Sequence, residues 1–229
     1  MIKGVFFDID DTLYDSTKLT TMARRNSIQA MMDVGLLKDE DAAYSMLEGI
    51  IERFGSNYSK HYDELLKESN VGWNPKIIAA GVVAYERTKV GYLKPFPRVI
   101  PTLLSLKKEY KLGVISNGLA VKQWEKLVGL GIHHLFDEVV TSEEIGAQKP
   151  EKEIFLSAVD KLKLSSMECA MVGDKLDTDI LGAKHVGMLA IRMLKGKFAS
   201  EEPSSEEYKP DFEISDISEV PEILRGQKG

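Results

Sequence analysis

The strongest constraint on the fold is a regular alternation of helical and strand patterns that begins after Gly91. Short apolar runs predict strands, and the amphipathic stretches between them predict helices. The predicted strands are 112–116, 137–141, 169–173, 188–193 and an edge strand at 211–214, and the predicted helices are 97–109, 120–129, 151–162, 177–186 and 217–225. This alternation is typical of an α/β protein with a doubly wound, Rossmann-like parallel sheet and right-handed crossovers.

A further predicted strand at residues 2–9 precedes a long stretch without strand patterns. Its nearly continuous apolar run is typical of a strand that a parallel sheet buries on both faces. Four helices are predicted next, near 17–33, 39–53, 58–69 and 75–90. We therefore predict an α/β catalytic core of residues 1–14 and 93–229, and a small helical bundle of residues 15–92 inserted after the first strand.

Composition excludes several functional classes. The chain has 30 Lys and Arg against 36 Asp and Glu, a net charge of −6, so it lacks the positive field that general binding to nucleic acid or an anionic membrane requires. Cys169 is the only cysteine, which excludes an internal disulfide and a cysteine-based zinc site and fits a reducing compartment. We expect a cytoplasmic protein with a small-molecule partner, and monomer and homodimer both stay open.

Polar residues collect where the predicted parallel strands end, which is the edge at which such sheets bind ligands. Asp8-Ile9-Asp10, Ser116-Asn117 and Asp174 follow three of the strands, and Lys149-Pro150 precedes a helix. Taken singly, each has an ordinary structural interpretation as a turn, a helix cap or a surface residue. Their combination at one edge is more informative than any one of them.

Several carboxylates at one sheet edge repel one another unless a cation lies between them. Mg²⁺ fits such a site, because it takes oxygen ligands from one or two carboxylates, water and phosphate, and needs neither His nor Cys. Ser116, Asn117 and the Lys149 ammonium would then hold the remaining anionic oxygens. The residues therefore predict a magnesium-dependent phosphate site.

These residues lie in four short segments whose order resembles that of the haloacid dehalogenase-like (HAD) hydrolases, subfamily I. The segments are Phe6–Leu13, Val114–Asn117, Lys149-Pro150, and Val172–Asp174 with Asp179. The resemblance covers the predicted core, whereas the helical stretch matches the family's cap domain in position and general character only. A cap in this position implies a lid that closes over the site and selects the substrate.

The resemblance also implies catalytic roles. Asp8 would be the nucleophile that forms an aspartyl-phosphate, and Asp10 would be first the general acid and then the general base. Mg²⁺ would be held by Asp8, by the main-chain carbonyl of Asp10 and by Asp174, with Asp179 as an outer ligand through water.

The same resemblance implies a phosphate-binding set. Ser116 and Lys149 would bind the oxygens of the transferring phosphoryl group, with Thr12 and Asn117 in supporting positions. Lys149 would also orient the nucleophile.

Two further aspartates lie inside these segments. Asp177 offers a second acidic position close to Asp179, and the motif spacing favours Asp179. Asp11 stands where many members of the family have Gly, and we interpret it as a turn or helix-capping residue.

The leading interpretation is a Mg²⁺-dependent phosphatase for a small phosphorylated metabolite, such as a triose, glycolate or sugar phosphate. A 2-haloacid dehalogenase shares the fold and the Asp nucleophile but needs neither metal nor a leaving-group acid, so Asp10 and Asp174 argue against it. A phosphonatase or a phosphomutase of the same superfamily stays open. A phospho-receiver module is the non-enzyme alternative, but it has no place for residues 17–90.

Overall fold

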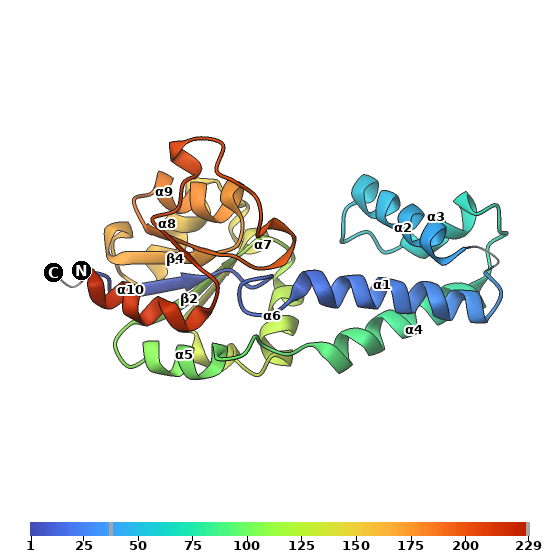
Figure 1. Cartoon of the computed structure of the whole chain (residues 1–229), viewed down its shortest axis with the longest axis horizontal. Coiled ribbons are helices and arrows are strands. Elements are labelled where there is room, and N and C mark those ends of the chain that lie inside the picture. Colours follow the sequence, from blue (N-terminus) through green and yellow to red (C-terminus); the bar gives the residue numbers. More distant parts are fainter. Residues whose placement is uncertain (37–38, 228–229) are drawn as a thin grey trace. The chain divides into compact units, whose positions relative to one another are not determined.

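The computed structural model describes residues 1–36 and 39–227 (Figure 1). Residues 37–38 of the predicted helical domain and 228–229 of the predicted core lie outside the described residues. The chain divides into two compact units. The first unit joins Met1–Thr17 to Leu93–Gly229, and the second is Lys18–Tyr92.

The first unit is built on a parallel sheet with the strand order β3-β2-β1-β4-β5-β6. The strands are β1 Gly4–Phe7, β2 Lys111–Ser116, β3 Glu138–Thr141, β4 Cys169–Gly173, β5 Leu189–Met193 and β6 Phe212–Ile214. β1 lies between β2 and β4, with Phe7 in register with Val114 on one side and with Val172 on the other. The strand order reverses direction at β1, so the predicted doubly wound α/β fold is confirmed.

Helices cover both faces of this sheet. They are α5 Val99–Leu106, α6 Ala120–Gly129, α7 Ser142–Ile145, α8 Lys152–Lys161, α9 Leu181–His185 and α10 Val220–Gly226. Figure 1 shows α8 and α9 over one face and α5 and α10 over the other. Because successive strand residues point to opposite faces, Phe6 joins Phe155 and Met171 in the core under α8 and α9, whereas Phe7 contacts the Phe136 ring edge-on. The sheet is thus buried on both sides.

The second unit is a bundle formed by α1 Ser16–Asp33, α2 Glu40–Phe54, α3 His61–Glu68 and α4 Pro75–Tyr92. Local signals start two of the helices. The Asp39 carboxylate accepts a hydrogen bond from the Ala42 amide at the start of α2, and Pro75 opens α4. The bundle has its own apolar core, made by Ile28, Met31, Leu36, Ala43, Leu47, Ile50, Leu65, Leu66 and Ile77.

The boundary between the units falls inside α1, after Thr17. The Asp11 carboxylate, from the loop after β1, accepts hydrogen bonds from the amide of Thr17 at 2.9 Å and from its hydroxyl at 2.5 Å. These bonds satisfy an amide in the first turn of α1 and hold that turn in the first unit. They agree with the interpretation of Asp11 as a helix-capping residue.

Two local elements differ from the expected pattern. The predicted helix at 177–186 is a π-helical turn, Leu176–Ile180, followed by the short helix α9. α7 was not expected, because four residues are too short for a helical period to be visible. Among the residues that the structure describes, no helix is long and apolar enough to cross a membrane.

Cys169 tests the packing at the start of β4. The thiol is fully buried, and burial together with the negative charge of Glu168 raises its pKa to about 12. Since the thiolate is the reactive form, we expect iodoacetamide at pH 8 to label the folded protein at least about 100-fold more slowly than the guanidinium-unfolded protein. Mass spectrometry would follow the labelling. Equal labelling rates in the folded and the unfolded protein would contradict a buried start of β4.

Candidate active site

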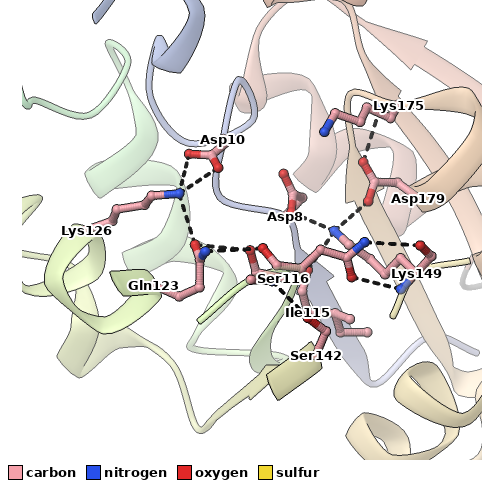
Figure 2. Close-up of polar contacts among 12 residues, drawn as sticks. Asp8, Asp10, Ile115, Ser116, Gln123, Lys126, Ser142, Lys149, Lys175 and Asp179 are labelled. Carbon is pink, nitrogen blue, oxygen red and sulfur yellow. Dashed lines mark hydrogen bonds and ion pairs between the residues drawn. The ribbon is translucent and has the colours of Figure 1, made fainter. Parts of the chain in front are cut away.

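Polar side chains from four segments meet at the carboxyl ends of β1, β2 and β4 (Figure 2). Asp8 follows β1, Ser116 ends β2, and Asp174 follows β4. Lys149 comes from the loop before α8. All four residues are buried, so the structure brings together side chains that lie far apart in the sequence.

The Lys149 ammonium is the centre of this cluster. Its Nζ donates to Asp8 Oδ1 at 2.6 Å, to Asp179 Oδ1 at 2.6 Å and to the main-chain oxygen of Ile115 at 2.9 Å. An ammonium has three donors, so all of them are used. The two carboxylates raise the pKa of Lys149 against the opposing effect of burial, and the side chain stays charged.

Asn117 holds the main chain of Lys149 from both sides. Its Oδ1 accepts from the Lys149 amide at 2.8 Å, and its Nδ2 donates to the Lys149 carbonyl at 3.1 Å. Both ends of the side-chain amide are therefore engaged with protein. The geometry gives Asn117 the task of fixing the loop that carries Lys149.

Asp174 is the least satisfied member of the cluster. It is 1% exposed, and neither carboxylate oxygen has a hydrogen-bond partner among the described residues. Burial, followed by the charges of Asp8 and Asp179, raises its pKa to about 9. A buried carboxylate without a partner is costly, and its environment favours either a proton or a cation.

The charges around Asp174 favour a cation. Carboxylate oxygens of Asp8, Asp174 and Asp179 lie within 4.8 Å of one another. Burial raises the pKa of Asp8 to about 6, opposed by Lys149 and reinforced by Asp179 and Asp10. Three carboxylates face one ammonium, and an all-oxygen donor set of this kind suits a hard cation such as Mg²⁺.

Asp179 reaches the cluster because of two local features. Asp179 lies on the π-helical turn Leu176–Ile180, and its Oδ2 accepts a hydrogen bond from the Lys175 amide at 3.1 Å. Gly173 provides the space, since a Cβ at this position would collide with the Asp179 carboxylate. Asp177, on the same turn, is exposed and lies outside the cluster. The structure thus brings in the aspartate that the motif spacing favoured.

Asp10 is not part of the group of three clustered carboxylates. Other groups hold it, and Figure 2 shows its contact with Lys126. The Lys126 ammonium donates to its two oxygens at 2.8 and 2.6 Å, and the Tyr14 hydroxyl donates to Oδ1 at 2.6 Å. Burial raises the pKa of Asp10, but Lys126, Tyr14 and Lys175 outweigh this effect and lower it. The two aspartates of the first segment therefore lie in opposite electrostatic environments.

The remaining predicted residues, Ser116 and Thr12, are both buried. The Ser116 hydroxyl donates to Gln123 Oε1 at 3.3 Å. Thr12 is fully buried, and its hydroxyl has no hydrogen-bond partner in the part of the chain that the structure describes. A buried hydroxyl of this kind is a donor still available to an anion.

Sequence analysis missed three residues of this region: Tyr14, Gln123 and Lys126. One signal was available, because Gln123 shares the buried face of α6 with Leu127. A polar residue on a buried face needs a partner. Nothing in the sequence distinguishes Lys126 from the other lysines.

Comparison with known proteins agrees with the geometry of this site. Residues 5–193 match the family model described as haloacid dehalogenase-like hydrolase. The chain belongs to the haloacid dehalogenase-like hydrolase family. The resemblance carried by the four short segments is thereby confirmed.

Two relatives of this HAD hydrolase match it over nearly their whole length. It is 49% identical to a glyceraldehyde 3-phosphate phosphatase of Methanopyrus kandleri, over 98% of each chain. It is 45% identical to a glyceraldehyde 3-phosphate phosphatase of Methanocaldococcus jannaschii, over 100% of this chain and 99% of the relative. Among solved structures, it is similar to a HAD phosphatase from Thermococcus onnurineus, with 28% identity, a TM-score of 0.68, and coverage of 98% and 99% of the two chains.

The unpartnered carboxylate of Asp174 leads to a prediction about the metal-free protein. Its pKa is raised above the unfolded value, so ionising it destabilises the fold as pH rises from about 4 toward 9. We expect Asp174→Asn to raise the melting temperature of the EDTA-treated protein at pH 7.5. The increase should be about 2–4 °C for each kcal/mol of destabilisation that the substitution removes. The same substitution should abolish the increase in melting temperature that Mg²⁺ produces in the unsubstituted protein.

The exposed Asp177 provides the matched control for this thermal-shift measurement. Asp177→Asn should change neither the metal-free melting temperature nor the shift with Mg²⁺. If Asp174→Asn behaved like Asp177→Asn in both respects, Asp174 would not be the residue that a cation stabilises.

Proposed function

We propose that this protein is a Mg²⁺-dependent phosphatase that hydrolyses glyceraldehyde 3-phosphate, a triose phosphate, through an aspartyl-phosphate on Asp8. The observation that carries the proposal is the buried arrangement in which Lys149 holds Asp8 beside the unpartnered Asp174. The substrate is supported by the two relatives of 45–49% identity that carry the name of this activity.

In the first step, a carboxylate oxygen of Asp8 attacks phosphorus. The new oxygen–phosphorus bond forms as the bond from phosphorus to the ester oxygen breaks. Asp10 gives its proton to the departing oxygen, and Lys149 holds Asp8 in place while its positive charge stabilises the phosphoryl oxygens. Mg²⁺, held by Asp8 and Asp174, would supply the charge that offsets repulsion between the carboxylate and the phosphate group.

In the second step, Asp10 takes a proton from a water molecule whose oxygen attacks the same phosphorus. The bond between phosphorus and Asp8 breaks, inorganic phosphate leaves, and the Asp8 carboxylate is restored. Asp10 regains in this step the proton that it gave in the first. Lys126 and Tyr14 lower the pKa of Asp10, which favours the ionised form that acts as the base and makes the protonated form a stronger acid toward the leaving oxygen.

The contacts refine the roles of the surrounding residues. We assign Asn117 to the support of Lys149, because both ends of its amide are bonded to that main chain. We assign the Thr12 hydroxyl, which has no hydrogen-bond partner among the described residues, to the phosphate oxygens, and Ser116 keeps its predicted phosphate role. Asp179 is assigned to Lys149, and its contact to Mg²⁺ through water stays a prediction, as does selection of the substrate by residues 18–92.

Release of inorganic phosphate tests the proposal. We expect the protein to hydrolyse glyceraldehyde 3-phosphate with Mg²⁺ and to lose this activity with EDTA. Asp8→Asn removes the nucleophile and should lower kcat at least about 1,000-fold, and Asp10→Asn should lower it about 100- to 10,000-fold. Asp177→Asn, an exposed substitution close to Asp179, should behave like the unsubstituted protein.

Three outcomes would contradict parts of this proposal. Full activity in Asp8→Asn would reject the nucleophile, and full activity in EDTA would reject the metal. Release of halide from 2-chloropropionate, without phosphate release from any ester, would replace the phosphatase by a dehalogenase. Phosphoglycolate and sugar phosphates in the same assay decide between the substrate classes that the sequence left open.

A further inference from the structure

Lys126 lies on α6, outside the four segments that carry the family resemblance. Its three ammonium donors are all used: two bonds reach Asp10, at 2.8 and 2.6 Å, and the third reaches Gln123 Oε1 at 3.0 Å (Figure 2). Two of the three donors are used on the Asp10 carboxylate, so the contacts of Lys126 point to a role that acts through Asp10.

Gln123 connects this pair to the phosphate-binding edge of the sheet. It is 4% exposed, its Oε1 also accepts from the Ser116 hydroxyl, and its Nε2 donates to the Asn117 carbonyl at 3.2 Å. Gly118 gives it room, since a Cβ there would lie 2.5 Å from Gln123 Nε2. Asp10 is thus connected through two side chains of α6 to the end of β2.

Tyr14 holds Asp10 from a second direction. Its hydroxyl donates to Asp10 Oδ1, which therefore accepts from both Tyr14 and Lys126. Asp10 Oδ2 accepts from Lys126. One aspartate is held by donors from two separate segments, and the plane of its carboxylate is fixed.

We propose that Lys126 is the positioning residue that, braced by Gln123, orients the Asp10 carboxylate for proton transfer to the leaving oxygen. This inference rests on the proposed phosphatase function and adds to it a residue that acts through Asp10. The side chains of Lys126 and Asp10 are 25% and 36% exposed, and ion pairs in such places add about 0–1 kcal/mol to stability. The contribution of this ion pair to the stability of the fold is therefore too small to explain its presence.

The chemistry of the leaving group separates positioning from a general structural role. An alkoxide, such as the one released from glyceraldehyde 3-phosphate, needs a proton as it departs, whereas p-nitrophenolate is a stable anion that leaves without one. The ratio kcat/KM reports the steps up to departure of the leaving group and excludes the later attack of water. Loss of Asp10 positioning should therefore lower kcat/KM mainly for esters with poor leaving groups.

The experiment compares kcat/KM for glyceraldehyde 3-phosphate and p-nitrophenyl phosphate in Lys126→Met, with Mg²⁺ present. We expect a loss of about 10- to 100-fold for the triose phosphate and less than about 3-fold for the aryl phosphate. Lys126→Arg keeps the charge and the donors, so it should recover most of the triose phosphate activity. Lys152→Met, which removes an exposed lysine on α8, should lower neither value.

A double-mutant cycle shows whether Lys126 acts through Asp10. In the Asp10→Asn background, Lys126→Met should cause no further loss with glyceraldehyde 3-phosphate. Equal losses for the two esters in Lys126→Met, or independent losses in the cycle, would overturn the positioning role.

A crystal structure of Lys126→Met provides a readout that does not depend on activity. We expect the Asp10 carboxylate to leave the orientation seen here, and an unchanged Asp10 would overturn the inference. If the unsubstituted protein hydrolyses neither ester, the proposed function fails, and the orientation of Asp10 in this crystal structure still decides whether Lys126 positions it.

Discussion

The buried ion pairs of Lys149 with Asp8 and Asp179 are the interaction on which the rest of the site depends. One ammonium, 2.6 Å from each carboxylate, joins the segment after β1 to the turn after β4. Removing either kind of partner would leave an uncompensated buried charge, which is strongly destabilising. Asp174 has no hydrogen-bond partner among the residues that the structure describes, and this residual negative charge makes the cluster suited to a cation.

The two aspartates that flank Ile9 show how one loop supplies two chemical environments. Asp8 lies in the buried acidic cluster, where its pKa rises to about 6, whereas Lys126 and Tyr14 lower the pKa of Asp10 against the effect of burial. Carboxyl groups with pKa values displaced in opposite directions are a common arrangement where one acts on the substrate and another transfers protons. The separation follows from topology, because Asp8 continues the central strand and Asp10 has already turned toward α6.

Much of the fold was predictable, because the helix and strand alternation after Gly91 repeats over many elements and leaves few topologies. The positions of Asp8 and Asp174 followed from the same pattern, since both come directly after buried strands. Motif spacing favoured Asp179 over Asp177, but the π-helical turn that carries Asp179 was not predictable, because a π-helical turn and an α-helix have similar sequence patterns. The contact of Lys126 with Asp10 depends on where α6 packs, and a single lysine on a helix surface carries no local signal of it.

The central claim is that the cluster around Lys149 holds a divalent cation between Asp8 and Asp174. Crystals grown with Mn²⁺, which takes oxygen ligands similar to those of Mg²⁺, would test it by anomalous diffraction at the manganese edge. The account predicts one strong anomalous peak in contact with carboxylate oxygens of both Asp8 and Asp174, and its loss in Asp174→Asn. No peak at this position, or a peak that persists in Asp174→Asn, would contradict the account.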